Sequence, residues 1–278
     1  MKIALFANET KGEAPRLLQQ LSSYLKRRGV DVPIESVGDA GQLDKQSLNS
    51  CDFLVSIGGD GSILHLLHRF GIPHSPIIGV NMGSLGFLAD IAANDMENGF
   101  EAIFKGAYHV IDRVVIEGRL SSSSSDYFAV NEVAVYRGDY PHIVDLTLHV
   151  DGQFVNTFSA DGVIVSTPCG STAYSLAAGG PILTPSVGAL VLTPICPHTI
   201  SNRPIVFMPK ESIEIGLSQG PAGVEVAFDG QAPGRLSLHE KLHLRVSPHP
   251  FRLVTLAESD FFSTLRTKLG WAGSLRKL

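Results

Sequence analysis

Hydrophobic and polar residues follow two different patterns along the 278-residue chain. In the first hundred residues, short apolar runs are separated by stretches in which apolar residues recur at helical spacing. The runs predict strands and the spaced stretches predict helices. The predicted strands are 2–7, 30–35, 53–57 and 77–81, and the predicted helices are 13–28, 62–70 and 95–105. Strands and helices in turn indicate a parallel sheet with helices on both faces.

The second pattern begins near Tyr108, from which the chain reads mostly as strands up to about residue 256. The dipeptide Asp151-Gly152 between two alternating runs is a strong hairpin signal. A short helix after Cys169 and a last helix at 260–269 interrupt this pattern. The predicted strands are 114–120, 127–136, 144–150, 153–158, 163–165, 190–195, 205–208, 212–216, 224–228, 242–246 and 252–256.

These patterns predict two domains. Residues 1–107, with about 257–278, should form an α/β domain around a parallel sheet. Residues 108–256 should form a β-rich, sandwich-like domain, and the C-terminal helix should return to the first domain.

Composition narrows the class of protein. Hydrophobic residues make up 44% of the chain and charged residues 18%, and the net charge is −5, which argues against a nucleic-acid partner. No apolar run approaches the length of a membrane helix, and the first apolar run is too short for a signal peptide. Three cysteines stand far apart without a Cys-x-x-Cys pair, so we expect a reduced, cytoplasmic protein without membrane contact.

The segment Gly58-Gly59-Asp60-Gly61 follows an apolar run and precedes the helix predicted from Ser62. Glycines let backbone N–H groups approach an anion, and a helix start adds unpaired donors, which suits phosphate. A carboxylate at the same place suits removal of a proton from a hydroxyl group. A tight turn with Asp60 as a helix cap explains the tetrapeptide equally well. The segment matches neither a Walker loop nor Gly-x-Gly-x-x-Gly.

A second candidate is the segment DGVIVSTPCGSTAY, residues 161–174. A strand runs into Pro168-Cys169-Gly170, and Ser171-Thr172-Ala173 begins a short helix. Backbone donors and hydroxyls at this helix start, with Tyr174 one turn in, would suit a nucleotide. An ordinary capped helix with Tyr174 in the core is the alternative.

A third candidate is the pair Asn131-Glu132 within the run FAVNEVAVY. On one strand the two side chains would point to opposite faces, so one would point inward and need partners. These partners would belong to a structural network or to a ligand. The dipeptide Asp229-Gly230, like Asp151-Gly152, is typical of a turn.

The sequence His239-Glu240-Lys241-Leu242-His243 matches the zinc-peptidase pattern His-Glu-x-x-His, which requires a helix. Apolar residues here alternate with a period of two, so the segment is predicted to be a strand. Its two histidines would then lie ~13 Å apart, too far to share one zinc ion.

Read together, the motifs resemble the NAD kinase family over nearly the whole chain. The resemblance rests on the segments 58–61, 83–87 (GSLGF), 131–132, 161–162, 166–168 (STP), 170–174 (GSTAY), 180–182 (GPI) and 229–231 (DGQ), and on the ending TLRTKLGW. The block Ser-Thr-Pro-x-Gly-Ser-Thr-Ala-Tyr is the most specific of them. The tetrapeptide Gly-Gly-Asp-Gly is shared with diacylglycerol-type lipid kinases, which remain the alternative to a NAD kinase.

The resemblance implies that Asp60 is the base that takes the proton from the 2′-hydroxyl of the adenosine ribose of NAD. ATP or polyphosphate would donate the phosphoryl group, with a divalent cation, usually Mg²⁺, whose protein ligands are unknown. Backbone donors of Gly58, Gly59, Gly61 and Ser62 would hold the donor phosphates. The implied NAD-binding residues are Asp60, Gly61, His65, Phe87, Asn131, Glu132, Asp161, Thr172, Ala173, Tyr174, Ser175, Leu176, Ala177 and Gln231.

The resemblance also implies a homodimer or homotetramer in which Asp161 reaches the nicotinamide end of a neighbouring subunit's NAD. This chain departs from the family pattern at two positions. Ser159 stands where relatives often carry Arg, and Cys169 stands where Thr or Ser is usual.

Overall fold

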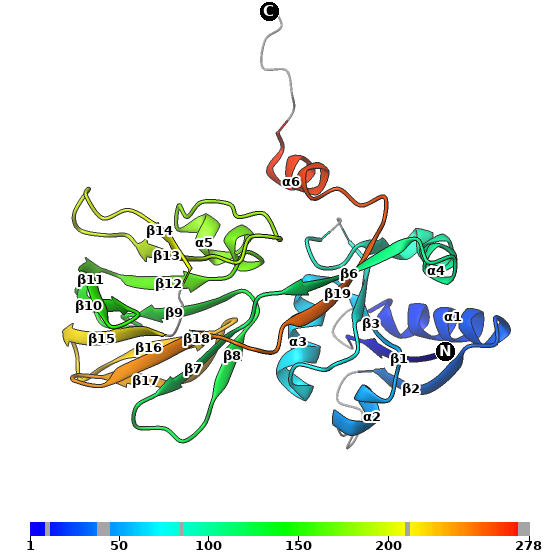
Figure 1. Cartoon of the computed structure of the whole chain (residues 1–278), viewed down its shortest axis with the longest axis horizontal. Helices are drawn as coiled ribbons and strands as arrows, with labels where there is room; N and C mark the ends of the chain where they lie inside the picture. The colour runs from blue at the N-terminus through cyan, green and yellow to red at the C-terminus, as the bar shows by residue number, and fades with distance from the viewer. Residues whose placement is uncertain (9–11, 38–44, 84–85, 209–211, 272–278) are drawn as a thin grey trace, which may run out of the picture. The chain divides into compact units, whose positions relative to one another are not determined.

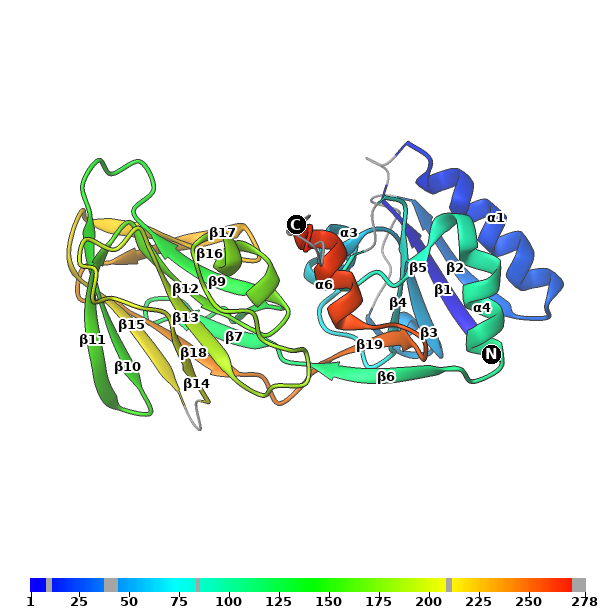
Figure 2. The same ribbon diagram turned by 90° about the horizontal axis from the view of Figure 1, so that it is seen from above.

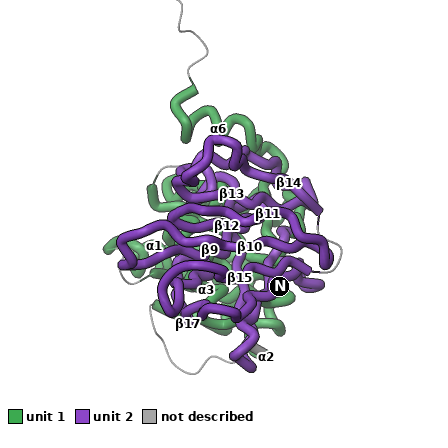
Figure 3. The backbone as a smooth tube through the Cα atoms, turned by 90° about the vertical axis from the view of Figure 1, so that its left-hand side faces the viewer, with its two compact units in different colours: residues 1–112, 251–278 green, residues 113–250 purple. Residues whose placement is uncertain are grey.

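The computed structural model describes residues 1–8, 12–37, 45–83, 86–208 and 212–271. The chain divides into two compact units (Figure 3). Unit 1 comprises Met1–Asp112 and Phe251–Leu278, and unit 2 comprises Arg113–Pro250. The described helices include none that is long and apolar enough to cross a membrane.

Unit 1 is built on a seven-stranded sheet (Figure 1). The strand order is β2-β1-β3-β4-β19-β6, and β5 pairs with β4. The bounds are β1 (Lys2–Ala7), β2 (Asp31–Val37), β3 (Phe53–Gly58), β4 (Ile77–Asn81), β5 (Ile91–Ala92), β6 (Tyr108–Arg113) and β19 (Phe251–Leu256). The pairs from β2 through β19 are parallel, so the carboxyl ends of β1, β3 and β4 lie at one edge.

Helices cover both faces of this sheet (Figure 2). The apolar sides of α1 (Ala14–Arg27) and α4 (Met96–Phe104) share one core with the sheet. On the opposite face lies α3 (Asp60–Phe70), whose Phe70 ring is 5.7 Å from the Phe6 ring of β1. The remaining helices are α2 (Lys45–Asn49), η1 (Ala93–Asp95) and α6 (Phe261–Leu269). The carboxylate of Asp260 caps α6 by accepting two backbone N–H bonds.

Unit 2 consists of two six-stranded sheets with the orders β11-β10-β15-β18-β7-β8 and β14-β13-β12-β9-β16-β17. Alternate residues of both sheets form one continuous core, as in a β-sandwich. The first sheet contains β7 (Ile116–Leu120), β8 (Tyr127–Ala129), β10 (Val144–Val150), β11 (Gln153–Ala160), β15 (Ile213–Gln219) and β18 (Lys241–Val246). The second contains β9 (Glu132–Tyr136), β12 (Gly162–Ser166), β13 (Leu190–Ile195), β14 (Ile205–Phe207), β16 (Gly223–Phe228) and β17 (Gln231–Ser237). Between β12 and β13 lie η2 (Gly170–Thr172) and α5 (Tyr174–Ala177).

The predicted fold class is confirmed: an α/β unit with a parallel sheet and a C-terminal helix, and a β-sandwich unit. The strand predicted at 127–136 was wrong, because the chain leaves the first sheet after β8 and enters the second at β9. The opposite-faces argument for Asn131 and Glu132 fails with it. Sequence patterns missed β6 and β17, and the helix predicted from Ser62 begins at Asp60.

Candidate active site

A pocket of about 880 Å³ opens at the carboxyl edge of the unit 1 sheet. Its wall includes the whole glycine-rich segment 58–61, the first turns of α3 and the ends of β1, β3 and β4. Ligands of open parallel sheets bind at this edge. Polar and apolar side chains share the wall: Asn8, Glu13, Ser36, Ser56, Ser62, His65, Arg69 and Asn81 among the former, and Phe6, Leu66, Phe70 and Met82 among the latter.

Asp60 occupies the first helical position of α3, and its carboxylate binds a backbone segment 27 to 29 residues further on. Oδ2 accepts the N–H of Phe87 at 2.8 Å. Oδ1 accepts the N–H groups of Leu88 at 3.0 Å and Ala89 at 2.9 Å. A Cβ atom at Gly86 would lie 2.0 Å from Oδ1 of Asp60. The expectation that Asp60 might be a helix cap is wrong, since Gly59 is the N-cap and no side chain caps α3.

The glycines of the segment allow a turn that other residues would block. Gly58 has φ +157°, and a Cβ there would lie 2.1 Å from the Ser62 hydroxyl. That hydroxyl accepts a 3.4 Å bond from the side-chain amide of Asn8 at the end of β1. The donors expected to hold phosphate therefore line the same pocket as Asp60.

Of the other expected residues of unit 1, His65 is exposed and contributes to the pocket wall. Phe87 is not among the residues that line this pocket. It is half-buried, begins the segment held by Asp60, and packs against Phe261 of α6 at 5.9 Å between ring centroids. Ser84 and Leu85 of the motif GSLGF lie outside the described residues.

Unit 2 holds its expected residues around the crossing from β8 to β9. The carboxylate of Asp229 accepts the N–H groups of Val130 and Asn131 at 2.8 Å and of Glu132 at 3.1 Å. In return, the N–H of Asp229 donates to the Glu132 carbonyl at 3.0 Å. These bonds explain why the predicted strand is interrupted. The N–H groups of Val130, Asn131 and Glu132 donate to the Asp229 carboxylate instead of to a neighbouring strand.

The segment DGVIVSTPCGSTAY packs directly on this crossing. The Thr167 N–H donates to the Asn131 carbonyl at 2.9 Å, and the Thr167 hydroxyl donates to the Val130 carbonyl at 2.5 Å. A Cβ at Gly170 would lie 2.1 Å from the Asn131 carbonyl oxygen. Glycine is therefore required there for close approach.

Glu132 is buried, and its Oε2 has no hydrogen-bond partner. Burial, and then the nearby Asp229 carboxylate, raise the pKa of Glu132 to about 7, while a backbone hydrogen bond from Tyr174 opposes the rise. A carboxyl group that is both buried and partly unpaired is typical of a ligand-binding site.

Residues 172–177 form η2 and α5 beside Glu132. Tyr174 is 43% exposed, so the alternative that it is a core residue is wrong. Burial of its hydroxyl raises the pKa of Tyr174. The hydroxyl of Ser175 bonds to Thr193 at 2.8 Å, and that of Thr172 donates to the Cys169 carbonyl at 3.0 Å. Ser175 is fully buried, Ala173 and Leu176 are half-buried and Ala177 is exposed, and Gln231 is exposed at the start of β17.

Asp161 pairs with Arg137, whose Nε donates to Asp161 Oδ1 at 2.8 Å. Both side chains are about one-third exposed. Sequence patterns missed Arg137 and treated Asp229 as a turn residue. Arg137 is a candidate because it pairs with Asp161, and Asp229 because it binds the Asn131-Glu132 pair. Both positions result from strand pairing, which the sequence does not show.

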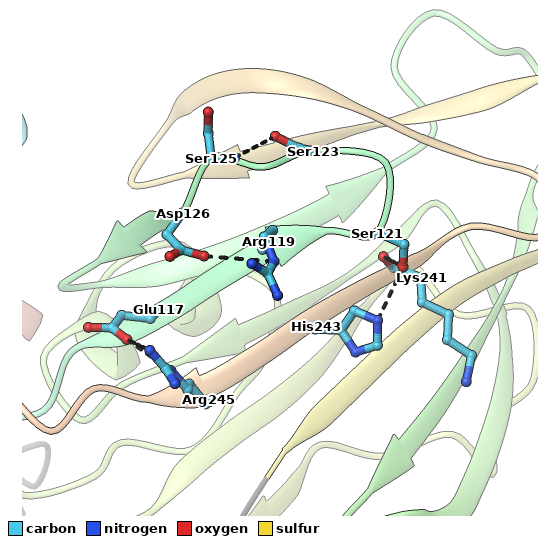
Figure 4. Close-up of polar contacts among 9 residues, drawn as sticks. All are labelled: Glu117, Arg119, Ser121, Ser123, Ser125, Asp126, Lys241, His243 and Arg245. Carbon is cyan, nitrogen blue, oxygen red and sulfur yellow. Dashed lines mark hydrogen bonds and ion pairs between the residues drawn. The ribbon is translucent and has the colours of Figure 1, made fainter.

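The zinc-site pattern His239–His243 does not form a metal site. His239 lies in the turn between β17 and β18 with φ +67°, and His243 lies on β18. Nε2 of His243 is 3.1 Å from the Ser121 hydroxyl, within a surface network of ion pairs (Figure 4). Within the described ranges, no group of three or more His, Cys, Asp or Glu residues could hold a metal.

A pocket at the carboxyl edge of an open parallel sheet, with a carboxylate beside a glycine-rich helix start, suits phosphoryl transfer. Comparison with known proteins makes the class specific. The N-terminal domain model of ATP-NAD kinase matches residues 39–108, and the C-terminal domain model matches residues 130–256. The chain belongs to the NAD kinase family.

Relatives and solved structures agree over the full length. The NAD kinase of Protochlamydia amoebophila is 47% identical, with 99% of each chain covered. That of Syntrophotalea carbinolica is 34% identical, covering 97% of this chain and 98% of its own. The yeast NADH kinase complexed with NADH has a TM-score of 0.87 at 25% identity, covering 100% of this chain and 89% of its own. The Archaeoglobus fulgidus NAD kinase in complex with ATP has a TM-score of 0.76 at 27% identity, covering 98% and 100%. Neither a lipid kinase nor a zinc peptidase is supported.

Proposed function

We propose that this phosphotransferase transfers the terminal phosphoryl group of ATP to the 2′-hydroxyl of the adenosine ribose of NAD, giving NADP and ADP. The observation that carries the proposal is the Asp60 carboxylate in the wall of the pocket. Three backbone donors fix it there, beside a helix start that suits phosphate.

Asp60 is the base in this proposal. Oδ1 accepts two backbone N–H groups and Oδ2 accepts one, so Oδ2 keeps the capacity to accept the proton of the ribose hydroxyl. The oxygen then attacks the terminal phosphorus of the donor, and the bond from phosphorus to the bridging oxygen breaks. The glycine-rich segment from Gly58 to Gly61 and the hydroxyl of Ser62 stabilise the charge on the phosphates; the N–H of Ser62 itself donates to the Gly59 carbonyl at 3.0 Å.

The donor brings a divalent cation, which we propose to be Mg²⁺. Mg²⁺ is usually held by one or two carboxylates together with substrate phosphates and water, rather than by a cage of protein ligands. The pocket fits this mode, because its wall holds the Glu13 carboxylate and the side-chain amide oxygens of Asn8 and Asn81, while Asp60 stays free to act as the base. The cation would neutralise charge on the phosphates. Polyphosphate is the second candidate donor.

Unit 2 supplies most of the NAD contacts in this proposal. The buried Glu132 carboxyl and Tyr174 contact the ribose region, and Asn131, Thr172 and Ala173 line the NAD site. The remaining proposed contacts are Gly61, His65 and Phe87 of unit 1 and Ser175, Leu176, Ala177 and Gln231 of unit 2. The unpartnered Oε2 of Glu132 and the exposed ring of Tyr174 support this assignment.

We also propose that the enzyme is a homodimer or homotetramer in the cytoplasm. Asp161 would contact the nicotinamide end of an NAD molecule bound mainly by a neighbouring subunit. Among the large apolar side chains exposed on unit 2, five are candidates for such an interface: Ile143, Phe154, Ile200, Val206 and Met208.

The test is an assay of the purified chain with NAD or NADH, each combined with ATP or polyphosphate in the presence of Mg²⁺. Formation of NADP from NAD and ATP is the expected result, and no phosphorylated dinucleotide in any combination would contradict the proposal. Mixing Asp60→Asn with Asp161→Asn subunits tests the shared site. Mixed oligomers should recover part of the activity, whereas no recovery despite subunit exchange, shown by mass, would exclude sharing.

A further inference from the structure

We propose that Asp229 is a positioning residue for NAD, which holds Asn131 and Glu132 in their binding geometry through the backbone. The inference rests on the proposed role of this pair in NAD binding. Asp229 itself lies in the Asp229-Gly230 turn between β16 and β17 and need not contact the dinucleotide.

The first argument is the bonding of the crossing segment. Between β8 and β9 the chain passes from one sheet to the other, so residues 130 and 131 belong to neither strand. Their N–H groups, with that of Glu132, converge on the Asp229 carboxylate at 2.8 to 3.1 Å. One side chain therefore replaces the ladder bonds and fixes the direction in which Asn131 and Glu132 project.

The second argument is that the segment is held from both sides. Thr167 binds the carbonyl groups of Val130 and Asn131, while Asp229 binds the N–H groups. Charged acceptors form stronger hydrogen bonds than neutral ones. Removing the Asp229 charge should weaken the bonds to the N–H groups of Val130 and Asn131. The bonds from Thr167 to their carbonyl groups should remain.

The third argument is electrostatic. The negative charge of Asp229 raises the pKa of Glu132, after the larger effect of burial. The backbone N–H of Tyr174 in α5 donates a hydrogen bond to Glu132 and lowers this pKa. Tyr136, Asp161 and Cys196 act on Tyr174 in turn. Asp229 therefore contributes, after burial, to raising the pH at which Glu132 becomes a carboxylate that can accept bonds from ribose hydroxyls.

The chain offers a matched control for Asp229→Asn. Asp151 also lies in an Asp-Gly hairpin turn, with φ +50° against +48° at Asp229. Its N–H donates to the Ser212 carbonyl at 2.9 Å, and its carboxylate accepts the Ser212 N–H at 3.2 Å. Asp151→Asn changes the same chemistry at a turn between β10 and β11, away from the NAD-binding pair.

The experiment measures KM for NAD, kcat and the pH dependence of KM in the wild type, Asp229→Asn and Asp151→Asn. Asp229→Asn should raise KM for NAD about 10-fold, the effect of one lost charged hydrogen bond, and change kcat less. It should also move the midpoint of the KM–pH profile to lower pH, because one negative charge beside Glu132 is gone. Asp151→Asn should change neither quantity.

The outcomes separate the two proposals. A wild type that makes no NADP overturns the proposed function. A wild type that makes NADP, with an Asp229→Asn variant that keeps both KM and the pH midpoint, overturns the positioning role alone. A purely structural role would lower thermal stability without moving the midpoint. Should Asp229→Asn not fold, Asp229→Glu provides the second test, because it keeps the negative charge and displaces the carboxylate from the three N–H groups. KM for NAD should rise, and an unchanged KM would overturn the proposal.

Discussion

Asp60→Asn tests the base and the loop anchor together, because the structure shows the carboxylate bound to the backbone of residues 87–89 and the proposed function makes the same carboxylate the base. Asparagine keeps one acceptor oxygen. Placed at the Oδ1 position, that oxygen still accepts the N–H groups of Leu88 and Ala89, but the amide NH₂ then faces the Phe87 N–H. The substitution therefore removes proton acceptance and leaves one backbone donor without a partner.

The two effects differ in size and in the assay that detects them. An unpaired N–H at Phe87 should reduce the free energy of unfolding by about 1–3 kcal/mol. Loss of a general base should lower kcat by about 10²–10⁴, or roughly 2.7–5.4 kcal/mol of activation free energy. Single-turnover phosphoryl transfer measures the second effect, and thermal denaturation of the same sample measures the first.

Asp90→Ala is the matched control in unit 1. The Asp90 carboxylate accepts the N–H of Leu256 at 2.9 Å and the hydroxyl of Ser259. Its loss should destabilise the same unit without removing a group from the pocket wall. If Asp60→Asn turned over as fast as Asp90→Ala at equal stability, Asp60 would be an anchor and not the base.

Three further predictions concern unit 2. Ser159 donates to Asp145 at 2.5 Å, so Ser159→Arg should place a cation there and change the NAD/NADH or donor preference; constant ratios across all substrates would contradict this. Cys169→Ser should tighten NAD binding by ~0.5–1.5 kcal/mol, because a hydroxyl is a better hydrogen-bonding group than a thiol, and calorimetry measures the difference. Glu132 has its pKa raised from 4.5 to about 7, so between these pH values the unfolded state ionises this carboxyl while the folded state keeps it protonated. The free energy of unfolding should therefore fall by about 3 kcal/mol between pH 4.5 and above 7, and urea denaturation of Glu132→Gln should show this part of the fall removed.

Periodicity predicted both units because it reports which face of each element is buried. The change near Tyr108 from helical spacing to alternation separates the two architectures, and most strand bounds lie within two residues of prediction. Periodicity does not report which strand a residue pairs with. The apolar run 127–136 alternates without interruption, yet the chain changes sheets inside it.

Sequence motifs proposed Asp60, Glu132 and Tyr174 as site residues by residue type, and these roles stay predictions. They did not reveal that Asp60 binds the backbone 27 to 29 residues away, or that Asp229 binds it 97 to 99 residues away. Such contacts depend on which loops the sheets bring together, and no local pattern encodes them.

Asp60 and Asp229 bind the backbone in the same way, but we propose different roles for them. Each carboxylate accepts one N–H at Oδ2 and two at Oδ1, from three consecutive residues. The bonding of the carboxylate therefore does not decide its role; its surroundings do. Asp60 lines a pocket that a hydroxyl substrate can enter, whereas Asp229 lies in a turn and acts on the buried Glu132. Loss of charge should consequently appear in kcat at Asp60 and in KM for NAD at Asp229, although both substitutions break the same kind of hydrogen bond.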